Sequence, residues 1–435
     1  MILDNDFNLF LTACVFGWVL FLYFANQLRC KRKFDLFDPF ILISGLYLLI
    51  FVWAPSVWMQ RGQTGYQGIE VMEYLPKGNA VFIIGYICFV LGSYSGRKKK
   101  KAFIICDNLS NSDKCIKYRC QISLYATVVF LASIALGLLY YRMQGKGFMY
   151  MLTLGQMGNE IEITKSTSFL FLSCFIRSAI PGLLMLVAFS EFNKAVLILA
   201  TLATIMITVT TGSRNLTISA ALAVIVYLYI SNNKRPRLRT SIFAIVILYI
   251  FVGFVGIYRG VMLSGGTIDL SAISLQSLLD AFMYNVEIFF PFYNLVETVP
   301  QKAGFNYGLG FLNVFIQFIP RAIWPGKPAT LGTSALSAVY GSSMGGAAYP
   351  NIGSFYYEFG VPGVIFLMYQ FGYRTQKYYW RGTTSKEKFR QIQFAIMFGY
   401  LFQFVCRSSI ASWGIDIAFM FGPIWIAKRY WGIKS

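Results

Sequence analysis

The sequence predicts an all-α polytopic membrane protein with about eleven transmembrane helices and one large loop outside the membrane. Three observations lead to this fold class. Hydrophobic residues make up 57% of the 435 residues, and charged residues only 13%. Apolar runs of about 20 residues, long enough to cross a bilayer as a helix, recur along the chain. Basic residues gather between alternate runs, as expected for a chain that crosses a membrane repeatedly.

The first apolar run is expected to stay as a membrane span. It follows Met-Ile-Leu-Asp-Asn-Asp, which has neither the basic n-region nor the small-residue cleavage site of a signal peptide. Ten further spans can be drawn along the chain. The eleven expected spans are residues 7–28, 39–57, 79–95, 121–141, 168–189, 195–211, 216–230, 241–258, 353–373, 391–406 and 409–427.

The charge distribution predicts the orientation of these spans. Basic runs follow the first, third, seventh, ninth and eleventh spans, and they begin at Arg29, Arg97, Lys234, Arg374 and Lys428. Positively charged connections favour the cytoplasm, so we expect the N-terminus outside and the C-terminus inside. The cytoplasmic segments hold 26 of the 38 basic and 6 of the 18 acidic residues, which leaves 12 of each for the spans and outer loops. The net charge of +20 is therefore a topology signal and does not indicate nucleic-acid binding.

The chain is expected to form a single integral membrane domain, residues 1–435, that contains one large periplasmic loop, residues 259–352. Two apolar stretches of the loop, residues 281–299 and 309–319, are expected to lie along the membrane surface or to re-enter it. The alternative is a twelfth and a thirteenth span. Glu287, Pro291 and the shortness of the second stretch argue against this alternative.

The stretch from Phe318 to Pro328 is the centre of the predicted site. Its three prolines fix φ and remove backbone donors, so no regular helix runs through it. It carries Arg321 and Lys327 beside Trp324 on a side of the membrane where the net charge is low. The alternative is a proline-bounded turn with solvated charges.

Other arginines are expected near the same surface. Arg214 lies in the turn Thr-Gly-Ser-Arg-Asn between two spans, where backbone N–H groups can face an anion. Arg259 ends a span, Arg407 begins the final hairpin, and Arg177 lies inside a span. Charges there are costly, and the planar guanidinium suits phosphate. The alternatives are capping of helix ends by Arg214 and pairing of Arg177 with a helix-end carbonyl.

Glu358 is the candidate general base, because burial beside tyrosines would raise the pKa of its carboxyl group. The alternative is a counter-ion for one of the arginines. The chain contains no histidine, which excludes histidine-dependent catalysis. Apart from Asp4-Asn5-Asp6 at the start of the chain, no D-x-D or H-E-x-x-H arrangement is present, and neither a metal nor a cofactor is expected.

Three motifs in the order found here resemble those of the bacterial oligosaccharide repeat-unit polymerases, meaning the O-antigen polymerases and the related enterobacterial common antigen polymerases. They are the Gly-Ser-Arg turn at Arg214, the Trp-Pro-Gly-Lys-Pro segment, and Cys-Arg-Ser-Ser at Arg407. The common antigen polymerases tend to have an acidic residue after the arginine that corresponds to Arg407, whereas this chain has Ser408.

The resemblance implies a glycosyltransferase in the bacterial inner membrane, with an architecture similar to the GT-C type. Because no metal motif is found, we expect the enzyme to be metal-independent. The resemblance also implies an undecaprenyl-pyrophosphate-linked glycan as donor and acceptor, membrane lipid around the protein and a chain-length regulator as a partner, but no nucleic acid. The residues expected to be catalytic are Arg321, Arg214 and Glu358. Those expected to bind pyrophosphate are Arg259, Lys327, Arg407 and Arg177.

Three other functions remain open. A flippase for lipid-linked oligosaccharides would also need a cationic cavity, but it would have short outer loops. An O-antigen ligase would share the architecture, but family ligases are expected to use a periplasmic histidine. A binding or structural membrane protein would leave the ordered cations unexplained.

Overall fold

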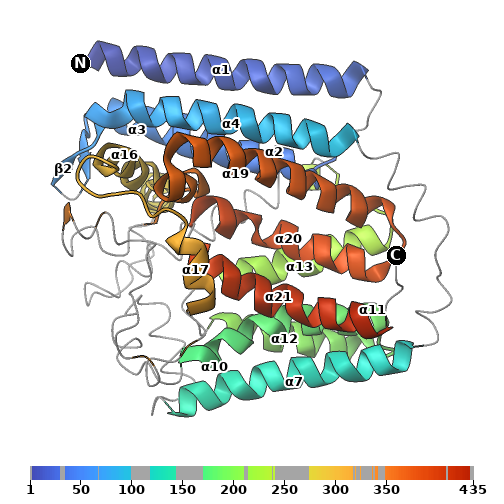
Figure 1. The fold of residues 1–435 in the computed structure, drawn as a ribbon. Helices are drawn as coiled ribbons and strands as arrows, with labels where there is room; N and C mark the ends of the chain where they lie inside the picture. The colour runs from blue at the N-terminus through green and yellow to red at the C-terminus, as the bar shows by residue number, and fades with distance from the viewer. Residues whose placement is uncertain are drawn as a thin grey trace.

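The computed structural model describes residues 2–29, 35–66, 68–98, 118–143, 170–209, 214–237, 239–240, 274–316, 319, 324, 336, 339–340, 348–407 and 410–431. Long helices lie alongside one another, and the two ends of the chain lie at opposite ends of this bundle (Figure 1). We call the end with the N-terminus the N face and the end with the C-terminus the C face.

The first three predicted spans are helices that run between the two faces. The second span contains a π-helical turn, which immediately precedes the helix that begins with Ala54 and Pro55. A proline has no N–H for the regular helical ladder, and a wider turn accommodates this defect. The elements are α1 (Ile2–Arg29), α2 (Pro39–Leu48), η1 (Leu49–Trp53), α3 (Ala54–Gln60), β1 (Gly65–Tyr66), β2 (Ile69–Glu70), η2 (Met72–Tyr74) and α4 (Leu75–Lys98).

The middle of the chain continues the alternation between the faces. The fifth predicted span is divided by a short 3-10 turn, which carries Arg177. The elements are α7 (Arg119–Met143), α10 (Leu170–Cys174), η4 (Phe175–Ser178), α11 (Ala179–Phe189), α12 (Lys194–Val209) and α13 (Arg214–Ser231). The predicted span 241–258 lies outside the described residues.

From residue 274 onward, the described residues form three short helices and three long ones. The short helices are α15 (Leu275–Val286), α16 (Phe289–Thr298) and α17 (Leu309–Ile316). The long helices are α19 (Asn351–Thr384), α20 (Lys388–Cys406) and α21 (Ile410–Trp431).

The all-α polytopic fold class is confirmed. The strands β1 and β2 pair with each other as a small antiparallel hairpin. Five helical stretches of the described part have the length and hydropathy of a membrane span, and two shorter apolar helices follow them. The total of eleven spans stays a prediction, as do the bounds of the large loop.

The apolar stretches of the predicted loop form helices that are too short to span a bilayer. With 10 and 8 residues, α16 and α17 extend about 15 Å and about 12 Å, against a hydrocarbon core of about 30 Å. Phe289, Phe290 and Tyr293 of α16 are fully buried. In Figure 1, α17 lies near the N face and runs across the direction of the long helices.

Glycines allow α4 and α19 to pack with their backbones in contact. A Cβ atom on Gly92 would lie 2.0 Å from the carbonyl oxygen of Tyr369. A Cβ atom on Gly372 would lie 2.1 Å from the carbonyl oxygen of Phe89. Small residues at such crossings let membrane helices approach closely.

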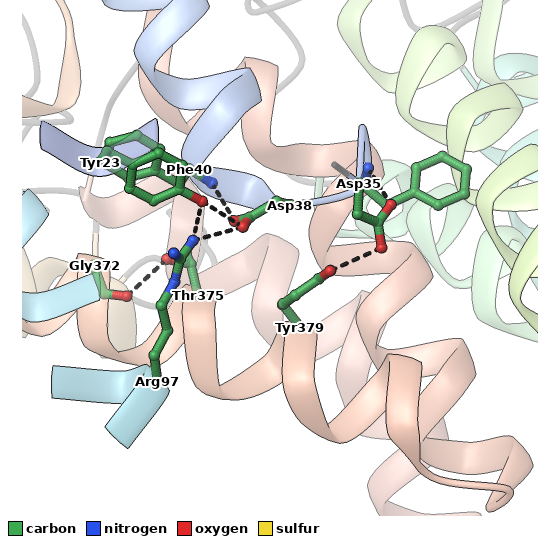
Figure 2. A network of polar contacts seen from close by, with 9 residues as sticks. Tyr23, Asp35, Asp38, Phe40, Arg97, Gly372, Thr375 and Tyr379 are labelled. Atoms are coloured by element: carbon green, nitrogen blue, oxygen red, sulfur yellow. Dashed lines mark hydrogen bonds and ion pairs between the residues drawn. The ribbon is translucent and has the colours of Figure 1, made fainter. Parts of the chain in front are cut away.

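A buried polar network joins α1, α2, α4 and α19 (Figure 2). Arg97 donates to Asp38 Oδ2 at 2.6 Å, and the Tyr23 hydroxyl donates to the same oxygen at 2.6 Å. Asp38 also caps α2 by accepting from the N–H of Phe40 at 3.1 Å. The side chains of Arg97 and Asp38 are only 4% and 7% exposed. The sequence grouped Arg97 with the basic run that follows it, whereas the structure places it in a buried ion pair.

Candidate functional site

Seven side chains carry the predicted chemistry, and the structure describes three of them in full. These are Arg177, Glu358 and Arg407. Arg214 begins α13, and only its backbone is described. The predicted residues that lie outside the described part of the chain are Arg259, Arg321 and Lys327.

Glu358 lies immediately before a kink in α19. Phe359 and Gly360 leave the helical conformation, and Gly360 has a φ of +65°, which glycine adopts without steric cost. Pro362 has no N–H, so it cannot donate to the carbonyl oxygen of Glu358 as a helical residue would. At the kink, carbonyl oxygens of α19 therefore lack their helical N–H donors and can accept hydrogen bonds from another segment.

Residues 306–310 dock onto this kink. The N–H groups of Asn306 and Tyr307 donate to the carbonyl oxygens of Tyr357 and Glu358, both at 2.9 Å. The Asn306 side chain donates to Glu358 Oε1 at 2.8 Å, and the N–H of Gly310 donates to Oε2 at 3.3 Å. Since Gly310 lies in the first turn of α17, one carboxylate holds both the preceding loop and the start of that helix.

The surroundings of Glu358 bear on its two predicted roles. Its side chain is 3% exposed, and both carboxylate oxygens accept hydrogen bonds. Within the described residues, no arginine or lysine forms an ion pair with it, so the counter-ion alternative finds no partner there. The role of general base stays a prediction.

Arg177 lies in η4, between α10 and α11. Its Nε donates to Asp416 Oδ1 on α21, and the Tyr400 hydroxyl on α20 donates to Asp416 Oδ2. One carboxylate therefore joins an arginine and a tyrosine from two other helical segments. The described partner of Arg177 is this carboxylate and not the helix-end carbonyl considered from the sequence.

The Arg177 guanidinium keeps part of its donor capacity. Its side chain is 26% exposed, whereas that of Asp416 is 7% exposed. In the described part of the chain, neither Nη1 nor Nη2 donates a hydrogen bond. Within the described residues, the two terminal nitrogens therefore have no acceptor.

Arg407 is the C-cap of α20 and is exposed. It lies seven residues after Tyr400, which places both residues on one side of the helix, about 10 Å apart along its axis. No acidic side chain of the described residues forms an ion pair with Arg407. Among the described residues it is thus a cation without an acidic partner, at the N face and beyond the level of Arg177.

Two other cations at this face have acidic partners. Arg61 pairs with Asp280 at 2.7 Å, and Lys77 pairs with Glu297 at 3.2 Å. In both pairs the acidic partner neutralises the basic side chain at a partly exposed surface. They distinguish Arg61 and Lys77 from Arg407.

Glu287 separates α15 from α16, outside the long helices. Burial raises the pKa of its carboxyl group to about 7, and the nearby Arg61 opposes this shift. This carboxyl group therefore titrates near neutral pH.

The sequence reading missed the partners of the described site residues. Asp416 lies inside the last predicted span and was not paired with Arg177 from the sequence, although two opposite charges in apolar spans are a signal for such a pair. No sequence pattern around Tyr400 or Asn306 indicated that these residues belong to the site. Among the described residues, no group of three or more His, Cys, Asp or Glu side chains is arranged to hold a metal ion.

Comparison with known proteins places this arrangement in a family. The family model described as O-antigen polysaccharide polymerase Wzy matches residues 1–432, almost the whole chain. No curated protein and no solved structure matches the chain significantly. The match agrees with the resemblance carried by the three motifs and favours neither the flippase nor the ligase. The chain belongs to the O-antigen polysaccharide polymerase Wzy family and is a multi-pass inner-membrane O-antigen polymerase that acts on lipid-linked oligosaccharide repeat units.

Proposed function

We propose that this O-antigen polymerase joins its units at the N face and that this face is periplasmic. The support is the placement of the basic residues. Arg29 ends α1, Arg119 begins α7, and Lys428 and Arg429 lie in the last turn of α21, all toward the C face (Figure 1). Basic connections favour the cytoplasmic side. The N-terminus, α16 and α17 are then periplasmic.

The proposed reaction moves a glycan from one undecaprenyl pyrophosphate to another lipid-linked unit. The bond between the anomeric carbon of the growing glycan and the pyrophosphate oxygen breaks, and its electron pair leaves with the pyrophosphate. A hydroxyl oxygen of the terminal sugar on the acceptor forms the new bond. The proton of that hydroxyl passes to a base or to the departing phosphate.

The partly free guanidinium of Arg177 is the observation that carries this proposal. Negative charge grows on the pyrophosphate as it leaves, and preorganised donors in a dry site lower the barrier to such a step. Arg177 is fixed through Nε and keeps Nη1 and Nη2 for the phosphate oxygens. A guanidinium offers these donors in one plane and stays charged at all relevant pH values.

Further cations complete the proposed site. Arg407 is exposed, lacks an acidic partner among the described residues, and lies beyond Arg177 toward the N face. Arg214, Arg259, Arg321 and Lys327 are proposed to join them. We propose that these side chains bear the charge that a divalent ion bears in metal-dependent glycosyltransferases.

Glu358 fits an anchoring role in this proposal better than proton abstraction. A general base needs a free lone pair within reach of the hydroxyl that it deprotonates. Both oxygens of Glu358 accept hydrogen bonds from residues 306–310, and the residue is only 3% exposed, so little of the carboxylate is open to a substrate hydroxyl. A chain-length regulator in the same membrane remains a proposed partner, and co-purification of the two proteins tests it.

The test of the proposed cation site is substitution of arginine by lysine. Arg177→Lys keeps the charge but has a single nitrogen to divide between Asp416 and the phosphate. Turnover of lipid-linked units by the purified protein should fall by about 10²–10³, the effect of removing one preorganised donor. Arg321→Lys should behave in the same way. In a deletion strain, lipopolysaccharide made by either variant should shift from long chains to single units.

Arg142→Lys is the matched control, because Arg142 is an exposed arginine in the last turn of α7. It should leave the banding unchanged, since surface substitutions usually change stability by less than about 0.5 kcal/mol. Normal banding from Arg177→Ala and Arg321→Ala, at equal protein level in the membrane, would refute the proposed site.

A further inference from the structure

We propose that Asp416 and Tyr400 are positioning residues that hold the Arg177 guanidinium in place for the lipid diphosphate. The inference rests on the proposed role of Arg177 and names two residues beyond it. Neither of them would touch the substrate. They would act through the arginine, by fixing which of its edges faces the ligand.

The geometry assigns one function to each edge of the guanidinium. Asp416 Oδ1 accepts from Nε, and this bond restrains rotation of the guanidinium plane. Asp416 Oδ2 accepts from the Tyr400 hydroxyl, so the carboxylate is itself held from α20. Nη1 and Nη2, which form the fork that binds phosphate oxygens, point to no described acceptor.

A second ion pair in the same protein shows what a purely structural pair looks like. Arg97 and Asp38 are 4% and 7% exposed, so both partners are buried. Arg97 Nη2 donates to both Asp38 and Tyr23, and its ring-facing guanidinium lies 4.3 Å from the centroid of Tyr23. In the pair of Arg177 and Asp416, the side chain of Asp416 is 7% exposed, whereas that of Arg177 is 26% exposed. The arginine is thus the partner that can meet a ligand.

Two side chains near the Tyr400–Asp416 bond have buried polar atoms without a hydrogen-bond partner. Gln403 lies between Tyr400 and Arg407 on α20, and its Oε1 has no hydrogen-bond partner. Trp413 stacks on Phe404 at 4.0 Å between ring centroids, and its Nε1 also lacks a partner. Gln403 and Trp413 each lie about one helical turn from the Tyr400–Asp416 bond, in the direction of Arg407. Unpaired buried polar atoms are rare, and a polar ligand or water explains them.

Electrostatics explains why an acid holds the arginine. An isolated charge among apolar helices is costly, and a paired carboxylate reduces this cost. Nε contact with Asp416 leaves the arginine charged and keeps its other edge directed away from the acid. Loss of the Asp416 charge should therefore loosen the guanidinium without removing it.

The experiment compares Asp416→Asn, Tyr400→Phe and Arg177→Ala in purified full-length protein. Asp416→Asn keeps the shape of the side chain, and kcat/KM for the lipid-linked unit should fall by about 100-fold, as expected for a misplaced catalytic group. Tyr400→Phe removes one hydrogen bond to a charged group and should lower it by about tenfold. Inhibition by inorganic pyrophosphate should weaken in both variants, which a purely structural role would not require.

The exchanged pair, Arg177→Asp with Asp416→Arg, separates positioning from structure. It restores an ion pair but moves the guanidinium to another helix. We expect it to raise the Tm above that of Arg177→Asp alone while turnover stays lost. Recovery of turnover together with the Tm would overturn the inference. If the exchanged protein does not fold, the test is the Tyr400→Phe variant, provided that its Tm equals that of the wild type. Wild-type turnover and unchanged inhibition by pyrophosphate in this variant would overturn the inference.

The same assay separates this inference from the proposed function. If Arg177→Ala is inactive while Asp416→Asn and Tyr400→Phe have wild-type kinetics, the positioning role is wrong and the arginine site stands. If Arg177→Ala keeps full turnover, the proposed role of Arg177 fails, and the positioning role fails with it.

Discussion

The side-chain amide of Asn306 donates a hydrogen bond of 2.8 Å to the carboxylate of Glu358, which lies 52 positions later in the chain. This bond and the one from the Gly310 N–H anchor the start of α17 to the kink of α19. We expect Asn306→Ala to lower the stability by about 1–3 kcal/mol, because it leaves a buried acceptor less satisfied. Thermal unfolding in detergent measures this loss.

Glu358→Gln distinguishes anchoring from proton abstraction. If Glu358 anchors residues 306–310, this variant and Asn306→Ala should reduce turnover to a similar, modest extent. A general base would instead give a loss of about 10²–10⁴ for Glu358→Gln alone. Gly310→Ala is a second probe, because its Cβ would lie 2.0 Å from Glu358 Oε1. The additional change Glu358→Ala removes this clash and should restore part of the folded protein.

Asp38→Ala is expected to destabilise the protein strongly. It leaves Arg97 buried without its counter-ion, and breaking a buried pair in this way costs about 3–5 kcal/mol. The Tm in detergent and the amount of protein in the membrane should both fall. Arg235→Ala is the control, since Arg235 pairs with Asp35 at 2.9 Å but is one-third exposed. An equal decrease in Tm for the two substitutions would contradict the expectation that the buried ion pair contributes more to stability than the exposed one.

Glu287 predicts a pH dependence of stability. Its pKa is raised from 4.5 to about 7 in the folded protein, so the folded state binds the proton more tightly than the unfolded state. The stability should therefore be highest below the unfolded pKa and should fall as the pH rises through this window. Glu287→Gln keeps a neutral side chain, so the Tm of the variant should exceed that of the wild type increasingly from about pH 5 to about pH 8. If the curves of Tm against pH for the wild type and for Glu287→Gln are parallel, Glu287 does not titrate in this range.

The proposed orientation predicts the readings of topology reporters. Fusions at Lys234 and Lys377 should report the cytoplasm, and fusions at Gly65 and Gly332 the periplasm. The reason is the excess of basic residues in the connections at the C face. A cytoplasmic reading at Gly332 would place the Arg321 segment on the wrong side of the membrane for the proposed reaction.

The proposed use of cations predicts that turnover survives chelation. Purified protein in EDTA should polymerise lipid-linked units at an unchanged rate, because arginine and lysine side chains meet the pyrophosphate charge. Addition of magnesium or manganese should then change nothing. Reversible loss of turnover in EDTA, restored by either ion, would require a metal site in place of this account.

The sequence alone determined the fold class and the course of most of the described spans. Helix length and hydropathy are properties of contiguous residues, so α1, α4 and α7 follow from composition within about 25 positions. The family could also be predicted, because its motifs are short and local. The kink in α19 was not predicted, although Gly360 and Pro362 stand in the sequence beside Glu358.

Only the tertiary structure decided which polar groups meet. Arg177 and Asp416 are 239 positions apart, and their contact depends on how η4 packs against α21. Arg97 belongs to a basic run in the sequence, but the packing of α4 against α2 buries it beside Asp38. A buried charge is stable only with a partner, and the partner is set by the relative rotation and register of helices far apart in the chain. Hydropathy of single segments does not contain that information.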